Sequence, residues 1–202
     1  MNRESKMPQI MSNAEISKAL EAIDRSTTSG KRAYAVMLLG TVLGLRACDV
    51  AGLKLGSIDW VGGEIKVLQA KTSKTVVLPL TNDIGKALED YILNARPKTE
   101  SDHVFIRLNA PFSVIKSAVT IGEIFYDCCK AVGLDYGKRF HILRRCLATA
   151  MINTGSPVTD VVQVLGDTHM DSTKKYLAFD SENLKQCALS LDGINPEGGD
   201  VL

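Results

Sequence analysis

The stretch RAYAVMLLGTVLGLRACD, residues 32–49, is the part of the sequence that most constrains the fold. Residues 32–43 are apolar nearly all round, which predicts a central buried helix. Gly44 is expected to end that helix, and a short helix should follow over about 47–53. Arg46 therefore stands at a helix start, where a cationic side chain and backbone N–H groups can face an anion together.

Asp49 follows Arg46 by three residues, on the same face of the expected short helix. A carboxylate at that spacing is close enough to hold the guanidinium in one orientation. An ordinary surface Arg–Asp pair explains this segment equally simply, and for the segment alone it is the favoured interpretation.

Outside this stretch the hydrophobic spacing predicts a mainly α fold with one small antiparallel β-sheet, of the α+β class. A capping box of Ser12 and Glu15 predicts a helix over about 13–25, followed by a loop over 26–30. Two hairpins are expected from short apolar segments that contain Ile58, Trp60, Ile65, Val67, Val76, Val77 and Leu78. Helices are expected at about 84–92, 113–132, 141–153, 158–165, 171–176 and 182–189, with an irregular segment at 97–111.

Composition indicates one folded domain and leaves its function open. The chain has 202 residues, of which 45% are hydrophobic and 23% charged, so a real core is expected over 11–190. Residues 1–10 should be a polar arm and 191–202 a disordered tail. The net charge of +1 gives no global argument for nucleic acid, so a basic surface would have to come from local clustering.

The numbers and spacing of cysteine and histidine argue against disulfide bonds and against a metal site. Five cysteines without a CxxC motif are typical of reduced thiols in a cytoplasmic protein. Three histidines without paired spacing make a zinc site improbable, so no metal is expected. The longest apolar run is too short to span a bilayer, and no membrane association is expected.

A second candidate site is the segment HILRR, residues 141–145. His141 and Arg144 lie on one face of a helix's first turn, so a phosphate there would meet an imidazole and a planar guanidinium together. Lys138 and Arg139 come just upstream. The alternative for this segment is a solvated basic helix start with a capping histidine.

The third segment, residues 165–176, runs LGDTHMDSTKKY. Tyr176 follows a polar and basic stretch, and an isolated tyrosine in such a place is usually a core or rim aromatic. The segment has meaning only in combination with the others.

Together the segments resemble the ordered motifs of the tyrosine recombinases of the phage integrase family: GLRxxD at 44–49, HxLRR at 141–145, and LGx at 165–167 with a tyrosine nine residues later. The hairpin QAKTSK at 69–74, followed by VLPL at 77–80, resembles the family's lysine-bearing β-turn. The resemblance covers nearly the whole chain and implies the DNA breaking-rejoining catalytic fold over 11–190.

The resemblance also implies roles for individual residues. Arg46 and Arg144 match the two catalytic arginines, Asp49 the acid that supports the first, and His141 the histidine of the second box. Lys71 matches the hairpin lysine, and Lys74 is the alternative, less favoured candidate for it. Tyr176 matches the nucleophile.

Asp167 departs from the family's pattern, which has histidine or tryptophan at this position. An ionised aspartate only accepts hydrogen bonds and would repel a phosphate. Either the aspartate faces away or His169 reaches in from two residues later. We expect weakened DNA cleavage with DNA binding retained.

The implied activity is site-specific DNA recombination, the integration or excision of a DNA segment or the resolution of dimers. Tyr176 would attack a phosphodiester and form a 3′-phosphotyrosine, without ATP, metal or other cofactor. The implied partners are double-stranded DNA, further copies in a homotetramer on DNA (with a monomer in isolation), and accessory DNA-bending or directionality proteins. The expected location is cytoplasmic and nucleoid-associated. Residues 182–189 would dock on a neighbouring copy or pack on their own domain.

Lysines and arginines near the motifs are expected to form a basic face that contacts DNA phosphates. The expected DNA-contacting residues are Lys74, Lys138, Arg139, Arg145, Lys174 and Lys175, with Lys31, Arg32 and Lys54 nearby in sequence. The acids are expected to concentrate instead at Asp180, Glu182, Asp192, Glu197 and Asp200.

Two other functions stay open at this point. One is a DNA-binding module that keeps the fold without catalysis, for which Asp167 is the best argument. The other is a type IB topoisomerase activity, which shares the covalent step but not strand exchange. Recombinases of this family usually carry a further N-terminal helical domain, so the chain is either a fragment or a naturally short member.

Overall fold

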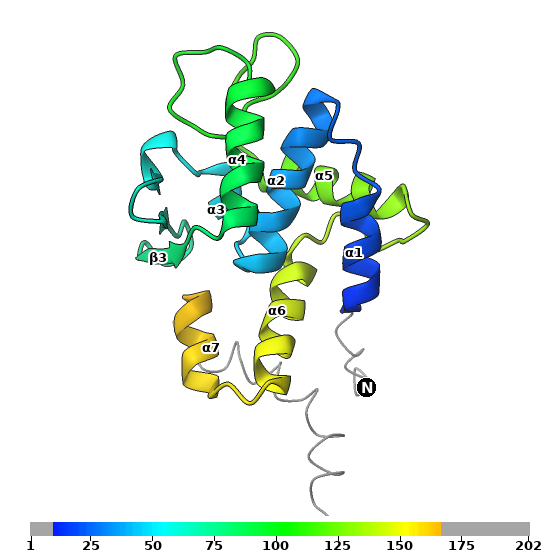
Figure 1. Cartoon of the computed structure of the whole chain (residues 1–202), viewed down its shortest axis with the longest axis vertical. Helices are drawn as coiled ribbons and strands as arrows, with labels where there is room; N and C mark the ends of the chain where they lie inside the picture. The colour runs from blue at the N-terminus through cyan, green and yellow to red at the C-terminus, as the bar shows by residue number, and fades with distance from the viewer. Residues whose placement is uncertain (1–9, 167–202) are drawn as a thin grey trace, which may run out of the picture.

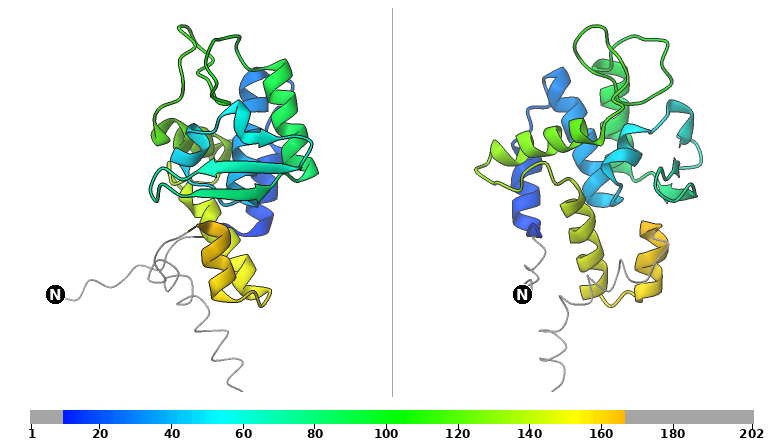
Figure 2. Two further views of the ribbon diagram at one scale, coloured as in Figure 1. Left: turned by 90° about the vertical axis from the view of Figure 1, so that its left-hand side faces the viewer. Right: turned by 180° about the vertical axis from the view of Figure 1, so that it is seen from behind.

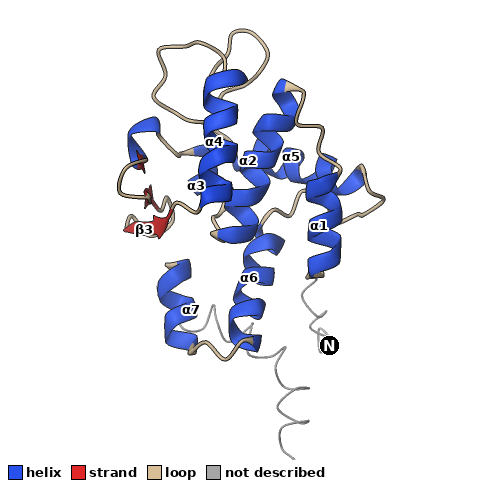
Figure 3. Cartoon of the chain, viewed as in Figure 1, coloured by secondary structure: helices blue, strands red, loops and turns tan. Residues whose placement is uncertain are grey.

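The computed structural model describes residues 10–166 of the chain. The helices expected at 171–176 and 182–189, the tail at 191–202 and nearly all of the N-terminal arm lie outside the described residues. The predicted central helix and small sheet are both present; within the described part, helices surround the central helix and the sheet lies at one side (Figures 1 and 3).

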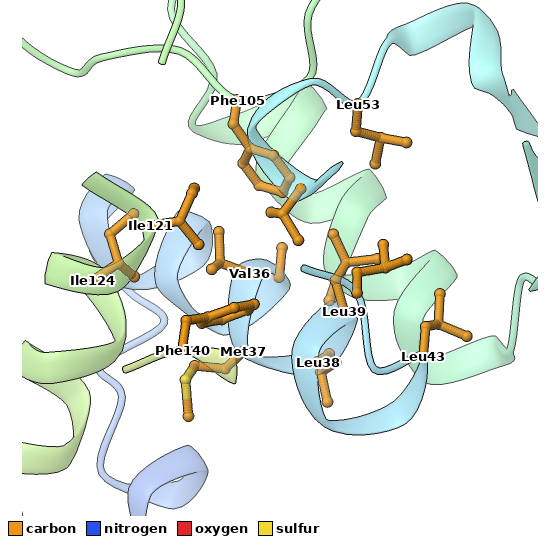
Figure 4. Close-up of a cluster of buried hydrophobic side chains, with 14 of the residues drawn as sticks. Val36, Met37, Leu38, Leu39, Leu43, Leu53, Phe105, Ile121, Ile124 and Phe140 are labelled. Atoms are coloured by element: carbon orange, nitrogen blue, oxygen red, sulfur yellow. The ribbon is translucent and has the colours of Figure 1, made fainter. Parts of the chain in front are cut away.

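The central helix is α2, Thr28–Val42. Val36, Met37 and Leu39 are fully buried in it, and they pack with side chains from the surrounding helices (Figure 4). The helix begins four residues earlier than the sequence predicted, because the Thr27 side chain accepts a hydrogen bond from the backbone N–H of Gly30 (3.0 Å) and so caps the helix start. The sequence predicted a loop over 26–30, but residues 28–30 belong to α2 and the observed loop is shorter.

Helix α1, Asn13–Glu21, begins with the predicted capping box of Ser12 and Glu15. It ends before residue 25, where the sequence placed its end. The Asp24 carboxylate accepts hydrogen bonds from the backbone N–H (2.9 Å) and hydroxyl (2.6 Å) of Ser26. A local bond of this kind forms a turn that competes with a further helical turn.

The sheet contains the two predicted hairpins. Strands β1 (Ile58–Asp59), β2 (Glu64–Leu68) and β3 (Thr75–Pro79) form an antiparallel sheet in the order β1-β2-β3. Strand β2 alternates between exposed and buried residues, and its inward face packs against the helical core (Figure 2). The short helix α3 (Ala47–Ala51) and the 3-10 turn η1 (Leu55–Ser57) lead into the sheet.

Helix α4, Asn82–Asn94, packs along α2, and the irregular segment predicted at 97–111 follows it. Tyr91 of α4 holds this segment in two ways. Its ring stacks on Phe105 with centroids 5.4 Å apart, and its hydroxyl oxygen accepts a hydrogen bond from the backbone N–H of Ile106 (3.3 Å).

Helix α5, Ala118–Lys130, starts five residues later than predicted. The backbone carbonyl of Ser113 accepts a hydrogen bond from the Arg107 N–H (2.9 Å), and Val114 forms an isolated bridge with Ile106. These contacts hold the segment after residue 112 in an extended conformation, so Ser117 becomes the helix cap.

Helices α6 (His141–Asn153) and α7 (Val158–Leu165) have the boundaries that the sequence predicted. They pack on each other through a second apolar cluster of Ala148, Val161 and Leu165. In Figure 1 they lie below the main core, with α7 on the side of the sheet. Gly166 closes α7 in the left-handed conformation (φ +64°).

Phe140 anchors the start of α6 in the core, where its ring meets Phe125 edge-on at 6.1 Å between centroids. We expect Phe140→Ala to lower the free energy of unfolding by about 3–5 kcal/mol, because a large buried ring is replaced by a cavity. Denaturant unfolding measures the change. Phe112→Ala is the matched control, since Phe112 is 42% exposed; equal losses in the two variants would contradict this account of the core.

Candidate active site

Arg46 and Asp49 form an ion pair at the start of α3. Arg46 is the N-cap residue of that helix, and its Nη1 atom lies 3.5 Å from Oδ2 of Asp49. The Asp49 side chain is fully buried, whereas the Arg46 side chain is 16% exposed. The interpretation as an ordinary surface pair is therefore wrong, because a buried carboxylate requires partners of this kind.

Asp49 also binds the β2–β3 turn. Its second carboxylate oxygen, Oδ1, accepts a hydrogen bond from the backbone N–H of Ala70 (2.9 Å). Ala70 precedes Lys71, so the carboxylate that holds Arg46 also holds the turn that carries the predicted hairpin lysine.

Arg144 is 5% exposed on α6 and joins two other parts of the chain. Its Nη1 atom donates a hydrogen bond to the backbone carbonyl of Gly44 (2.9 Å). Its Nη2 atom donates to the backbone carbonyl of Leu165 (2.6 Å). The second predicted arginine thus reaches the turn before Arg46 and the C-terminal end of α7.

Gly44 is required at this junction for two reasons. Its backbone is left-handed (φ +61°), and a Cβ atom there would lie 2.9 Å from side-chain carbons of both Leu147 and Leu165. The glycine of the GLRxxD motif therefore lets α6 and α7 approach the turn that presents Arg46.

His141 is the first residue of α6 and is exposed, while Arg144 one turn later is buried. Desolvation by surrounding protein atoms lowers the pKa of His141 below its usual value, and the charges of Arg145 and Arg139 lower it further. The neutral imidazole is therefore favoured at neutral pH. The N-cap residue of α6 is Phe140, whose side chain makes no capping hydrogen bond, so His141 does not occupy the capping position of the alternative interpretation.

Lys71 is exposed in the turn between β2 and β3. The backbone N–H of Gln69 donates to the Lys74 carbonyl (2.9 Å), and the Ser73 N–H donates to the Gln69 carbonyl (2.8 Å). These bonds close the turn and leave the side chains of Lys71 and Lys74 at the surface.

Gln69 is a site residue whose importance the sequence did not reveal. It is 2% exposed although its neighbours in the turn are exposed, and its Nε2 atom donates to the Leu165 carbonyl (3.0 Å). The sequence signal was only its place in the QAKTSK segment. A buried amide within a polar turn cannot be recognised without the partner, which lies 96 residues away.

The expected basic face is partly neutralised by acids that the sequence analysis did not associate with it. Lys31 pairs with Asp90 (2.6 Å) and Lys54 with Asp102 (2.9 Å). Acids are therefore not kept apart from these lysines, as the expected segregation of charge required. Arg32 is half-buried and donates to the Ile106 carbonyl (3.2 Å), which is a structural role.

The cations beside the second motif are exposed or partly exposed. Lys138 binds Glu123 (2.8 Å), and this hydrogen bond raises its pKa. The Nε atom of Arg139 donates to the carbonyl of Tyr136 (2.8 Å), and Arg145 is partly exposed. The other predicted site residues, Asp167, His169, Lys174, Lys175 and Tyr176, lie outside the described residues.

Within residues 10–166 no helix is long and apolar enough to cross a membrane. In the same part of the chain, no three side chains of the metal-binding types gather in a way that could hold a metal ion.

The model of the phage integrase family matches residues 9–183. The chain belongs to the phage integrase family. In Sinorhizobium fredii, the integrase/recombinase protein y4rA is 36% identical over 94% of this chain, and y4gC is 30% identical over 93%. The chain spans 46% of the length of y4rA but 97% of y4gC.

Two solved recombinase structures share the fold. XerH recombinase bound to its palindromic difH substrate after cleavage matches with a TM-score of 0.74 and 21% identity, over 92% of this chain and 55% of that one. The lambda integrase tetramer bound to a Holliday junction matches with a TM-score of 0.62 and 21% identity, over 87% and 50%. The predicted tyrosine recombinase catalytic fold is confirmed.

The two hydrogen bonds of Arg144 give a stability prediction. Arg144→Met leaves the Gly44 and Leu165 carbonyls without this donor, so we expect the free energy of unfolding to fall by about 3 kcal/mol. Arg145→Met is the matched control, because Arg145 is the next residue and is partly exposed. Denaturant unfolding compares the two variants, and equal midpoints would show that the buried bonds contribute nothing.

Proposed function

We propose that this chain cuts and rejoins double-stranded DNA as a site-specific recombinase, with Tyr176 as its nucleophile. The observation that carries the proposal is the junction of three motifs. Arg46 and the Lys71 turn share Asp49, while Arg144 binds the turn before Arg46. Membership of the phage integrase family supports the same conclusion.

The proposed roles follow from the charge that develops during phosphodiester cleavage. Negative charge gathers on the non-bridging oxygens, and Arg46 and Arg144 stabilise it; one such preorganised donor typically contributes about 3–4 kcal/mol to lowering the barrier. Lys71 donates a proton to the departing 5′ oxygen as general acid.

The nucleophile needs help to lose its proton, because an ordinary tyrosine pKa is about 10. The lowered pKa of His141 keeps its imidazole neutral, so it can accept a hydrogen bond or a proton during the attack. The products are a 3′-phosphotyrosine and a free 5′-hydroxyl. One ester replaces another of similar energy, so the step needs no ATP, and a second 5′-hydroxyl reverses it to exchange strands.

DNA is the proposed partner, in keeping with the DNA-bound XerH and lambda integrase structures. We propose a homotetramer on DNA and a monomer without it, acting with accessory DNA-bending or directionality proteins at the nucleoid. Phosphate contacts would make binding strongly salt-dependent. The proposed contacts are Lys74, Lys138, Arg139, Arg145, Lys174 and Lys175. The proposed catalytic domain covers residues 11–190.

Tyr176→Phe tests the covalent step. The probe is a library of nicked duplexes of random sequence. After cleavage the fragment beyond the nick diffuses away with its 5′-hydroxyl, so the reaction cannot reverse and the protein stays covalently attached to the DNA. We expect the natural chain to form a covalent adduct that survives denaturing electrophoresis, and Tyr176→Phe to form none, since phenylalanine has no oxygen nucleophile. Sequencing of the trapped members identifies the target.

Tyr126→Phe is the matched control, because this partly exposed tyrosine of α5 lies outside the proposed site. DNA binding without any adduct in the natural chain would contradict the proposal in favour of a DNA-binding module. Relaxation of supercoiled DNA without recombinants would favour a topoisomerase.

Asp167→His tests the departure from the family's pattern. Histidine can donate a hydrogen bond to the phosphate where an ionised aspartate repels it, so we expect faster adduct formation on the trapped sequence with similar DNA affinity. Asp160→His is the control, because Asp160 is exposed on α7. An unchanged cleavage rate in Asp167→His would show that Asp167 does not limit the reaction.

A further inference from the structure

Gln69 is buried in a turn that is otherwise exposed. Burial of an amide removes its bonds to water and is unfavourable unless the protein replaces them. Here both ends of the amide are bonded: Oε1 accepts from the Thr72 hydroxyl (2.8 Å) and Nε2 donates to the Leu165 carbonyl (3.0 Å). The orientation of the amide is fixed, because a carbonyl can only accept a hydrogen bond.

The Leu165 carbonyl is shared by two donors. Arg144 Nη2 lies 2.6 Å from this oxygen and Gln69 Nε2 lies 3.0 Å from it. A carbonyl oxygen has two lone pairs, so one atom can accept both bonds. The turn that carries Lys71, the buried guanidinium and the end of α7 therefore meet at a single oxygen atom.

Gly166 makes this approach feasible. A Cβ atom at residue 166 would lie 2.3 Å from the Nε2 atom of Gln69, far inside van der Waals contact. Glycine is thus required at position 166 for two reasons: the left-handed backbone (φ +64°) and the close approach of the Gln69 amide. The space between α7 and the turn fits the Gln69 amide and excludes a side chain at 166.

Two adjacent residues give the turn two separate attachments. Ala70 binds Asp49, the partner of Arg46, and Gln69 binds the Leu165 carbonyl, the partner of Arg144. One attachment alone would let the turn pivot, whereas two fix its orientation relative to both arginines.

We propose that Gln69 is a positioning residue of the cleavage reaction, which holds the Lys71 turn in register with Arg144 through the Leu165 carbonyl. This inference rests on the proposed function, in which Lys71 donates a proton to the leaving 5′ oxygen. Loss of the Gln69 bond displaces the proton donor, and a displacement of about 1 Å can slow such a step on the order of 100-fold.

The test compares two leaving groups on the sequence trapped by the natural chain. One duplex is unmodified, and in the other sulfur replaces the bridging 5′ oxygen at the cleavage point. With sulfur, the tyrosine hydroxyl gives its proton to His141, the tyrosine oxygen–phosphorus bond forms and the phosphorus–sulfur bond breaks. The sulfur leaves as a thiolate without being protonated first, because a thiol with a pKa of about 8.5 is a far better leaving group than an alcohol. A fault in proton donation therefore disappears on the sulfur duplex.

We expect Gln69→Leu to cleave the unmodified duplex about 10- to 100-fold more slowly than the natural chain, and the sulfur duplex at close to the natural rate. Lys71→Ala should show the same pattern. Gln163→Leu is the matched control, since Gln163 is exposed on α7, and it should match the natural chain on both duplexes.

Gln69→Asn gives the same test with a smaller change, for the case that Gln69→Leu does not fold: the amide remains, but it is too short to reach the carbonyl. Thermal unfolding shows that each variant is folded. If the Gln69 variants cleave the unmodified duplex at the natural rate, or lose the same factor on both duplexes, Gln69 does not position the proton donor. The proposed function still stands in that case, because the natural chain forms the adduct. Absence of any adduct in the natural chain overturns the proposed function itself.

Discussion

The hydrogen bonds to the Leu165 carbonyl are the interaction on which the candidate site depends. A guanidinium inside a protein is stable only if polar groups replace its water, and Arg144 obtains this from the carbonyls of Gly44 and Leu165. These carbonyls belong to two different turns. The need to satisfy one buried cation therefore fixes the end of α7 against the turn between α2 and α3.

Glycines make such close packing feasible at two points of the junction. At Gly44 a side chain would collide with Leu147 and Leu165, and at Gly166 with Gln69. Both residues also adopt the left-handed backbone that glycine accommodates without strain. The glycines of the GLRxxD motif and of the LG pair are thus structural requirements for bringing the arginines and the lysine turn together.

Charge at the surface is arranged differently from charge in the site. Lys31, Lys54 and Lys138 each have an acidic partner, and the exposed pairs of Lys54 and Lys138 contribute little to stability. Asp49, in contrast, is buried: its Oδ1 accepts a hydrogen bond from the backbone N–H of Ala70, and its Oδ2 forms an ion pair with Arg46 at 3.5 Å. The carboxylate therefore fixes geometry, whereas the surface acids moderate the positive charge that DNA would meet.

The sequence by itself determined the family, the fold class and most elements. Helices α6 and α7 have the predicted boundaries because hydrophobic period and glycine punctuation are local signals, and the strands follow from residue alternation. It also placed Arg46, Asp49, Lys71 and Arg144 in the motifs that the structure gathers. The starts of α2 and α5 were misplaced, because the cap of Thr27 decides the first and the contacts of Ser113 and Val114 with residues 106–107 decide the second.

Only the tertiary structure decided which polar groups are buried and what they bind. Asp49 could have been a surface acid and Gln69 a solvated turn residue; their partners lie 21 and 96 residues away, and no local pattern encodes that distance. Burial is a property of the whole chain, because it depends on which elements pack together. The motifs name the residues of the site, and packing turns them into one connected structure.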